Sequence, residues 1–281
     1  MRTTAPGRRL IGATVDHGLQ EGSAGRARAT ADLLTRLGCA DVHVLTVTVG
    51  RAGGPEAAAR HARYAALGEL SVALGGAPVL LGHTLDDQAE TVLLGLARGS
   101  GPRSIAGMRS WRAPWGRPLL GVTRADTEAT CADAGLTPWR DPHNADPAFT
   151  RVRLRIEALP LLDDVLGGGV RTALARTADL MSDDLAALDR IADDALDRAR
   201  DGDALRRSTL ADQPAAVRRR VLRRWLAPIG APALTHDHLV RLDAQLVDRS
   251  GPRQVRLPGG LDVWRRGDQL IAERPTPAPP P

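Results

Sequence analysis

The first half of the chain alternates short apolar strands with helical stretches. Apolar runs rich in β-branched residues occupy 10–15, 42–49 and 78–83, and helical patterns run through 23–37, 55–74, 84–98 and 124–134. Strands separated by helices of this length form βαβ units with parallel strands. We therefore predict an α/β fold with a doubly wound, mostly parallel sheet. Ligands of such sheets bind beyond the carboxyl ends of the strands.

Charge is segregated along the second half of the chain. Residues 163–197 hold nine Asp and three Arg, whereas residues 198–256 hold thirteen Arg and six Asp. The apolar spacing of the acidic stretch fits a long helix or a helix pair, and 254–274 contains three short strand patterns. We predict an α/β domain at 1–162, a small, mainly helical domain with a short β-ribbon at 163–274, and a disordered Pro-rich tail at 275–281.

Composition removes several classes of protein. The 281 residues are 43% hydrophobic, which is enough for a packed core, and contain no apolar run of membrane-spanning length. Two cysteines are too few for a disulfide framework, and the N-terminus lacks a secretory pattern, so we predict a cytoplasmic protein. All 38 basic residues are arginine. Lysine-based covalent catalysis is therefore excluded, and phosphate binding has to use guanidinium groups.

The densest polar cluster is Gly-His-Thr-Leu-Asp-Asp-Gln-Ala-Glu-Thr at 82–91. In the simpler interpretation Thr84 caps a helix, and the acidic residues after it interact favourably with the helix dipole. In a functional interpretation His83, Asp87 and Glu90 share one helical face at the carboxyl end of a strand. Such a group could hold a magnesium ion, a cationic amine or a proton in transit.

Two further motifs also allow two interpretations. Asp16 and His17 follow the first strand, where they either form a turn or lie beside a nucleotide. Arg151 and Arg155 are four residues apart, so they either lie on a solvated helix face or present two guanidinium groups to phosphate.

A strongly basic helix is predicted at 216–226, Ala-Val-Arg-Arg-Arg-Val-Leu-Arg-Arg-Trp-Leu. It either forms the polar side of an amphipathic helix or contacts an anion. Because five arginines without an intervening acid repel one another unless an anion lies nearby, we favour contact with a nucleic-acid backbone.

Taken together, these segments resemble the tRNA(Ile)-lysidine synthetase family of the N-type ATP pyrophosphatase superfamily, whose fold is of the adenine-nucleotide α-hydrolase type. The segments that carry the resemblance occur in the family's order: VDHGLQEGS at 15–23, GHTLDDQAETVLLGLARGSG at 82–101, GM at 107–108, W-R-DPHN at 139–144, RVRLR…LP at 151–160 and LPGGLDVWRRGDQL at 257–270.

The resemblance implies a ligase that forms a C–N bond. ATP adenylates C2 of the wobble cytidine in the CAU anticodon of an isoleucine tRNA through its oxygen, and the amine of free lysine then displaces AMP to give lysidine. Magnesium would bridge the phosphates, and the family also suggests a homodimer. The implied residues are Asp87 and Arg151 for catalysis, His83 and Glu90 around lysine and cytidine, Asp16 and His17 by the nucleotide, Asp86 as a metal ligand, and Arg98, Arg155, Arg218, Arg219 and Arg223 for tRNA.

The chain departs from the family pattern in three ways. The family's pyrophosphate loop, Ser-Gly-Gly-x-Asp-Ser, is absent, and we expect a truncated or mis-started gene product with a gap in its sheet. Val152 stands where the family usually has Asn, and a single C-terminal domain resembles the family's short form.

Two alternatives remain open. One is a tRNA thiolation enzyme of the same superfamily. Such enzymes commonly use a CxxC motif or paired cysteines, whereas Cys39 and Cys131 each stand alone. The other is a catalytically inactive remnant that binds tRNA.

Overall fold

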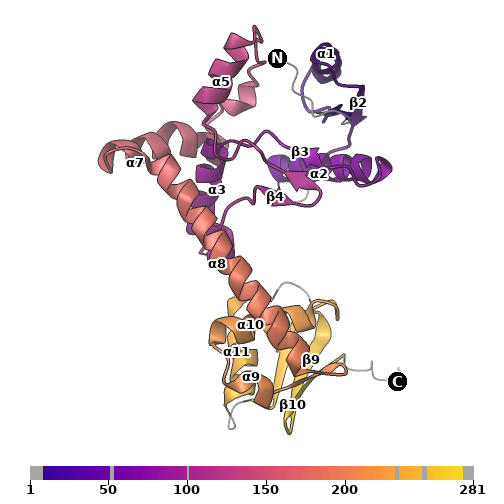
Figure 1. Cartoon of the computed structure of the whole chain (residues 1–281), viewed down its shortest axis with the longest axis vertical. Coiled ribbons are helices and arrows are strands. Elements are labelled where there is room, and N and C mark those ends of the chain that lie inside the picture. The colour runs from indigo at the N-terminus through magenta and orange to yellow at the C-terminus, as the bar shows by residue number, and fades with distance from the viewer. Residues whose placement is uncertain (1–8, 51–53, 100, 232–233, 249–251, 275–281) are drawn as a thin grey trace. The chain divides into compact units, whose positions relative to one another are not determined.

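The computed structural model describes residues 9–50, 54–99, 101–231, 234–248 and 252–274. The chain forms two compact units (Figure 1). Unit 1 comprises Met1–Gln88 and Met108–Leu161, and unit 2 comprises Ala89–Gly107 and Leu162–Pro281. The chain therefore leaves unit 1 within one helix, α3 (Leu85–Ala97), and returns to it at Met108.

Unit 1 has the alternating order that the sequence predicts. Its elements are β1 (Ile11–Asp16), α1 (Ser23–Arg36), β2 (Asp41–Thr46), α2 (Pro55–Ala73), β3 (Val79–Leu80), the start of α3, β4 (Trp111–Arg112), β5 (Trp115–Gly116), α5 (Arg124–Asp133), η1 (Pro142–Asn144), α6 (Thr150–Arg153), η2 (Leu154–Ala158) and the start of α7 (Leu159–Val165). β1 pairs with β2 in parallel, and β3 pairs with β5 in parallel. The predicted α/β class with parallel strands is thus confirmed.

The described strands of unit 1 form two sheets, whereas the sequence suggested one. β1 and β2 make one sheet, and β3, β5 and β4 make the other, with β4 antiparallel to β5. Local chemistry defines the helices: α2 begins at Pro55, and Thr123 and Asp126 form a capping box at the start of α5. α6, η2 and α7 follow one another without a break, and η2 is a π-helical turn.

Unit 2 contains one long helix and an antiparallel sheet. Its elements are the rest of α3 and α7, α4 (Pro102–Ile105), α8 (Val170–Ala199), β6 (Arg200–Asp201), β7 (Ala204–Arg206), α9 (Ser208–Ala211), α10 (Ala215–Leu226), α11 (His236–Val247), β8 (Gln254–Leu257), η3 (Pro258–Gly260), β9 (Leu261–Arg266) and β10 (Gln269–Glu273). The acidic stretch is therefore largely one helix, not a pair. The sheet runs β6-β7-β10-β9-β8, so it is larger than the predicted ribbon.

The core of unit 2 lies between this sheet and the helices α8, α10 and α11. Apolar side chains from the helices, such as Ala195, Leu222 and Leu242, pack with Val263 and Leu270 of the strands. α10 lies against both α8 and α11, so its polar side chains reach acidic residues on two neighbouring helices. Among the described helices, none is long and apolar enough to cross a membrane.

Candidate active site

Asp87 lies in the first turn of α3, the helix that follows β3 in the chain. Its Oδ2 accepts hydrogen bonds from the backbone N–H of Thr84 at 2.8 Å and from the Thr84 hydroxyl at 3.0 Å. Its Oδ1 lies 3.1 Å from a terminal nitrogen of Arg124 and 3.8 Å from one of Arg155. One oxygen of Asp87 thus bonds to the residue before the helix, and the other faces two guanidinium groups; the functional interpretation stays a prediction.

Asp86 is held by a different element. Its Oδ2 accepts the backbone N–H of Arg124, the first residue of α5, at 2.7 Å. The two neighbouring carboxylates thus tie the start of α3 to the start of α5. Among the described residues, no group of three or more His, Cys, Asp or Glu side chains is arranged to hold a metal ion. The assignment of Asp86 as a metal ligand stays a prediction.

His83 is partly buried beside Asp87, and its imidazole is neutral at pH 7. Burial is the main cause that lowers its pKa from 6.5 to about 4. The Asp87 carboxylate opposes this shift, whereas the guanidinium groups of Arg117, Arg60 and Arg151 add to it. These interactions bring His83, Asp87 and Arg151 into one electrostatic neighbourhood. The buried His83 Nδ1 makes no hydrogen bond within the described part of the chain.

Two other predicted residues, one within α3 and one just after it, differ in burial. Glu90 is fully buried, three residues after Asp87 in α3. Arg98 follows the end of α3 and is exposed. The proposed roles of both residues stay predictions.

Asp16 and His17 shape the loop after β1. Asp16 Oδ1 accepts the backbone N–H of Gly18 at 3.0 Å, and this bond, with one from Ser23, lowers the pKa of Asp16. Burial and the charge of Arg63 lower the pKa of His17. The Arg63 Nε donates a hydrogen bond to His17 Nε2 at 3.3 Å.

The loop after β1 contacts the Asp-Pro-His-Asn motif more than a hundred residues away, which no local sequence pattern predicts. Gln20 Nε2 donates to Asp141 Oδ1 at 3.0 Å and lies 2.9 Å from His143 Nδ1. Arg26 donates to Gln20 Oε1 at 3.0 Å and stacks over Trp139, 4.6 Å from the ring centroid. Both motifs therefore belong to one polar network in unit 1.

Gln88 is a second residue whose role the sequence analysis missed. Its buried side-chain amide donates to the Met108 carbonyl at 2.9 Å and accepts the Met108 N–H at 2.8 Å. The only sequence signal was the presence of both residues in family motifs, since no local pattern connects positions twenty residues apart.

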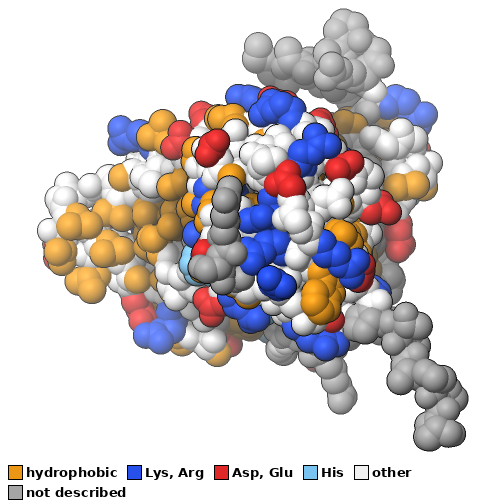
Figure 2. All heavy atoms as spheres, turned by 90° about the horizontal axis from the view of Figure 1, so that it is seen from below, with side chains coloured by type: hydrophobic (Ala, Val, Ile, Leu, Met, Phe, Trp, Pro, Cys, Tyr) orange, Lys and Arg blue, Asp and Glu red, His pale blue; other side chains and the backbone are white. Residues whose placement is uncertain are grey.

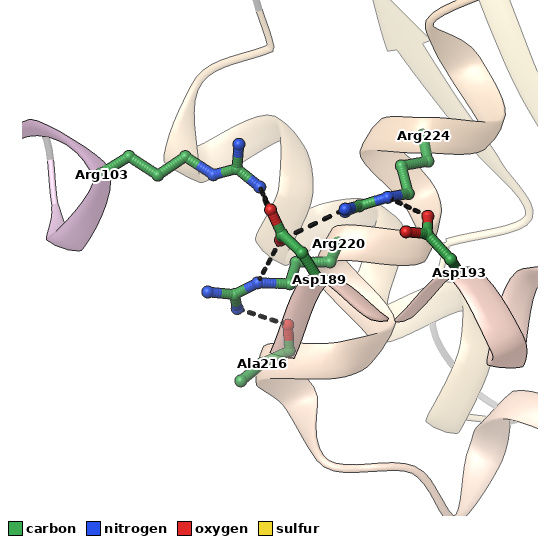
Figure 3. A network of polar contacts seen from close by, with 6 residues as sticks. All are labelled: Arg103, Asp189, Asp193, Ala216, Arg220 and Arg224. Atoms are coloured by element: carbon green, nitrogen blue, oxygen red, sulfur yellow. Dashed lines mark hydrogen bonds and ion pairs between the residues drawn. The ribbon is translucent and has the colours of Figure 1, made fainter. Parts of the chain in front are cut away.

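The basic helix α10 meets acidic partners from its own unit. Arg218 pairs with Asp243 of α11, and Arg219 lies 3.3 Å from the same carboxylate. On the side of α10 that faces α8, Asp189 contacts three arginines (Figure 3). Its carboxylate lies 2.8 Å from Arg103, 3.1 Å from Arg220 and 3.3 Å from Arg224.

Arg224 also pairs with Asp193 in the network of Figure 3. Three carboxylates, those of Asp189, Asp193 and Asp243, therefore offset part of the charge repulsion that was inferred among the five arginines of α10. Contact of Arg218, Arg219 and Arg223 with tRNA stays a prediction. Arg223 differs from its neighbours, because burial and the nearby charge of Arg103 lower its pKa.

Two family models match the chain. A PP-loop domain matches residues 2–162, and a TilS substrate binding domain matches residues 205–271. Several curated proteins named tRNA(Ile)-lysidine synthase are similar over most of their length. The protein from Nocardia farcinica is 57% identical over 260 residues, which cover 92% of this chain and 80% of that protein.

Two further relatives show the same relationship. The protein from Mycobacterium tuberculosis is 53% identical, covering 92% of this chain and 79% of its own, and that from Thermobifida fusca is 52% identical, covering 94% and 83%. Among solved structures, a U34-tRNA thiolase from Methanococcus maripaludis matches with a TM-score of 0.51 and 16% identity, covering 62% of this chain and 63% of that one. This last likeness concerns the fold alone.

Proposed function

Because the chain belongs to the tRNA(Ile)-lysidine synthase family, we propose that it modifies the wobble cytidine of the CAU-anticodon isoleucine tRNA. ATP adenylates C2 of the cytidine through its oxygen, with release of pyrophosphate. The amine of free lysine then attacks C2, and AMP leaves, so that a C–N bond replaces the C–O bond. Since the reaction consumes ATP and tRNA, we propose the cytoplasm as its location.

The contacts around Asp87 support the lysine-transfer step of the proposed reaction. A lysine ammonium has to lose a proton before it can attack, and a carboxylate within reach can accept it. Thr84 and Arg124 fix the Asp87 carboxylate from two directions. Asp87 is therefore preorganised to orient the amine and take its proton.

His83 and Arg151 complete this neighbourhood. A neutral His83 next to Asp87 does not repel a lysine ammonium, and its buried Nδ1 can bond to the amine or the cytidine. Arg151 would stabilise negative charge as AMP leaves. Glu90 would complete the lysine and cytidine site, and Asp16 and His17 would lie by the nucleotide.

Magnesium enters the proposal only with ATP. Mg²⁺ is usually held by one or two carboxylates together with substrate phosphates. Asp86, whose Oδ2 accepts the backbone N–H of Arg124, would be the carboxylate that helps to hold such an ion beside the ATP phosphates.

The domain boundaries and the assembly state are also proposals. We propose that residues 1–162 form the catalytic domain and that residues 163–274 position the tRNA, in line with the two family matches. The compact units differ in one respect, because Ala89–Gly107 groups with the C-terminal part. Arg98, Arg155, Arg218, Arg219 and Arg223 are proposed tRNA contacts, and a homodimer is proposed from the family.

The test separates the two chemical steps. Unmodified isoleucine tRNA with a CAU anticodon is incubated with the 281-residue chain, labelled lysine and α-labelled ATP. We expect Asp87→Asn to lower lysine incorporation by about 10²–10⁴-fold while labelled adenylate accumulates on the tRNA.

Asp133→Asn, an exposed acid at the end of α5, is the matched control and should leave both steps unchanged. Equal loss of both steps in Asp87→Asn would contradict the assignment of Asp87 to the lysine step. Binding of tRNA by the unaltered chain without lysine incorporation would favour the inactive remnant. Incorporation of sulfur into the tRNA in place of lysine would favour the thiolation enzyme.

A further inference from the structure

Arg124, the first residue of α5, places its guanidinium on the carboxylate that the proposed reaction assigns to the lysine amine. A terminal nitrogen of Arg124 donates a hydrogen bond to Asp87 Oδ1 at 3.1 Å. Arg155 approaches the same oxygen less closely, at 3.8 Å, which is beyond hydrogen-bonding distance. A cation of the protein therefore lies at Asp87 Oδ1, where the lysine ammonium would bind.

The main chain of Arg124 is fixed by contacts that do not involve its side chain. Its backbone N–H donates to Asp86 Oδ2 at 2.7 Å. The preceding residue, Thr123, forms a capping box with Asp126 at the start of α5. Rotation about the side-chain bonds of Arg124 can therefore move the guanidinium while the start of α5 stays in place.

The guanidinium of Arg124 is held only weakly at Asp87. The side chain of Arg124 is 35% exposed and that of Asp87 is 19% exposed, so water screens the attraction between them. Among the described residues the Arg124 side chain makes one hydrogen bond, to Asp87, and its buried Nε makes none. Because a buried donor without an acceptor costs free energy, the guanidinium leaves this position more easily than a fully bonded one would.

The Asp87 carboxylate is also held by contacts that do not depend on Arg124. Its Oδ2 accepts the backbone N–H of Thr84 at 2.8 Å and the Thr84 hydroxyl at 3.0 Å. Both bonds involve the oxygen that Arg124 does not contact. Asp87 Oδ1 therefore keeps its direction when another cation takes the place of the guanidinium.

We infer that Arg124 competes with the lysine ammonium for Asp87 and has to be displaced before lysine can react; the inference rests on the proposed function. Both groups are cations that donate N–H bonds to a carboxylate, so each excludes the other from the same oxygen. The guanidinium thus covers Asp87 while lysine is absent, and the free energy of its pairing with Asp87 is subtracted from that of lysine binding. Arg124 thereby controls the access of the amine to Asp87.

The experiment measures binding of lysine to the full chain by calorimetric titration, without tRNA or ATP. Arg124→Gln removes the competing charge, and we expect it to bind lysine about two- to fivefold more tightly, which is the range that partly exposed ion pairs contribute. Arg124→Lys keeps a cation beside Asp87 and should bind lysine nearly as the unaltered chain does. Norleucine, which has the carbon chain of lysine without the side-chain amine, should gain nothing from Arg124→Gln.

Two control variants separate exchange at Asp87 from a general loss of positive charge. Arginine side chains are numerous on the face drawn in Figure 2, and the chain has a formal net charge of +5, so the loss of any arginine reduces the repulsion of lysine. Arg241→Gln removes an exposed arginine of α11, and Arg155→Gln removes the arginine that lies 3.8 Å from Asp87. We expect no gain in Arg241→Gln, and a smaller gain in Arg155→Gln than in Arg124→Gln.

Three results would overturn the inference. They are an unchanged or weaker affinity for lysine in Arg124→Gln, an equal gain in either control variant, and an equal gain for norleucine. Thermal unfolding of each variant shows whether the fold is intact. Arg124→Met, which keeps a long side chain without the charge, repeats the test if Arg124→Gln unfolds early.

Lysine incorporation into isoleucine tRNA, measured with the same proteins, separates this inference from the proposed function. If Arg124→Gln binds lysine more tightly but the unaltered chain incorporates none, the proposed function fails while the role of Arg124 stands. If the unaltered chain incorporates lysine but Arg124→Gln binds it no more tightly, the role of Arg124 is wrong and the proposed function stands.

Discussion

Arg218 and Asp243 form a two-point ion pair between α10 and α11, with Nε 2.6 Å from Oδ1 and a terminal nitrogen 3.1 Å from Oδ2. Both side chains are largely buried, with 13% and 7% of their surface exposed. The pair therefore joins two helices of the unit 2 core, and the basic helix has a structural role whatever else it contacts.

Asp243→Asn should destabilise unit 2 strongly. The substitution leaves the Arg218 guanidinium buried beside a neutral amide, and breaking a buried pair on one side costs about 3–5 kcal/mol. Urea unfolding measures the loss. Asp237→Asn, at the exposed first turn of α11, serves as the control and should cost about 1 kcal/mol or less. Similar losses for the two variants would show that the pair contributes little.

The free energy of unfolding should decrease at acidic pH because of His83. Its pKa is about 4 in the folded chain and near 6.5 in the unfolded one, so between these values the unfolded state binds more protons. The free energy of unfolding therefore decreases as pH falls from about 6.5 to about 4, and His83→Gln should make this decrease shallower. Urea unfolding at several pH values checks it, with exposed His61→Gln as the control. Parallel curves for His83→Gln and the unaltered chain would contradict the prediction.

Gln20→Ala should loosen the Asp-Pro-His-Asn loop. The substitution removes the bonds to Asp141 and His143, each worth about 0.5–1.5 kcal/mol. Amide hydrogen exchange at residues 139–146 should become up to about tenfold faster. Glu21→Ala, which keeps the backbone carbonyl that Arg26 contacts, is the neighbouring control. Unchanged exchange in Gln20→Ala would mean that the loop is held by other contacts.

Gly95→Ala should disrupt the contact between α3 and the segment around α4. A Cβ at this position would lie 2.1 Å from the backbone oxygen of Ser104, so the backbone has to move, at a cost of about 1–3 kcal/mol. Gly68→Ala in α2 is the matched helical glycine, because its nearest contact would be Trp115 at 3.9 Å. That change should be neutral or stabilise by up to about 1 kcal/mol. Thermal unfolding of both variants tests the difference, and equal shifts would contradict it.

Local chemistry made much of the fold predictable. The strand at 10–15 and the helices of the first half were recognisable from apolar periodicity and from helix-terminal residues, because these signals act within a few positions of the chain. Thr84 as the cap of α3 was visible for the same reason. The order of the family motifs then indicated a fold and a chemistry that no single motif could establish.

Contacts between distant residues were not predictable in this way. Asp243 lies 25 residues after Arg218, and Gln20 lies 121 residues before Asp141, so nothing in the local pattern links them. The partial charge compensation of α10 was not predictable, because a sequence shows repulsion between neighbours on one helix but not the carboxylates that other helices bring to it. The division into two sheets likewise depends on strand pairing over long separations.

The two hydrogen bonds between Gln88 and Met108 have a consequence for how the chain is built. Gln88 is the last residue of unit 1 before the segment Ala89–Gly107 of unit 2, and Met108 is the first residue of unit 1 after it. The side-chain amide of Gln88 thus closes the loop formed by residues 89–107 at its base. The two ends of the segment 89–107 are therefore held together by a side chain and a backbone outside that segment.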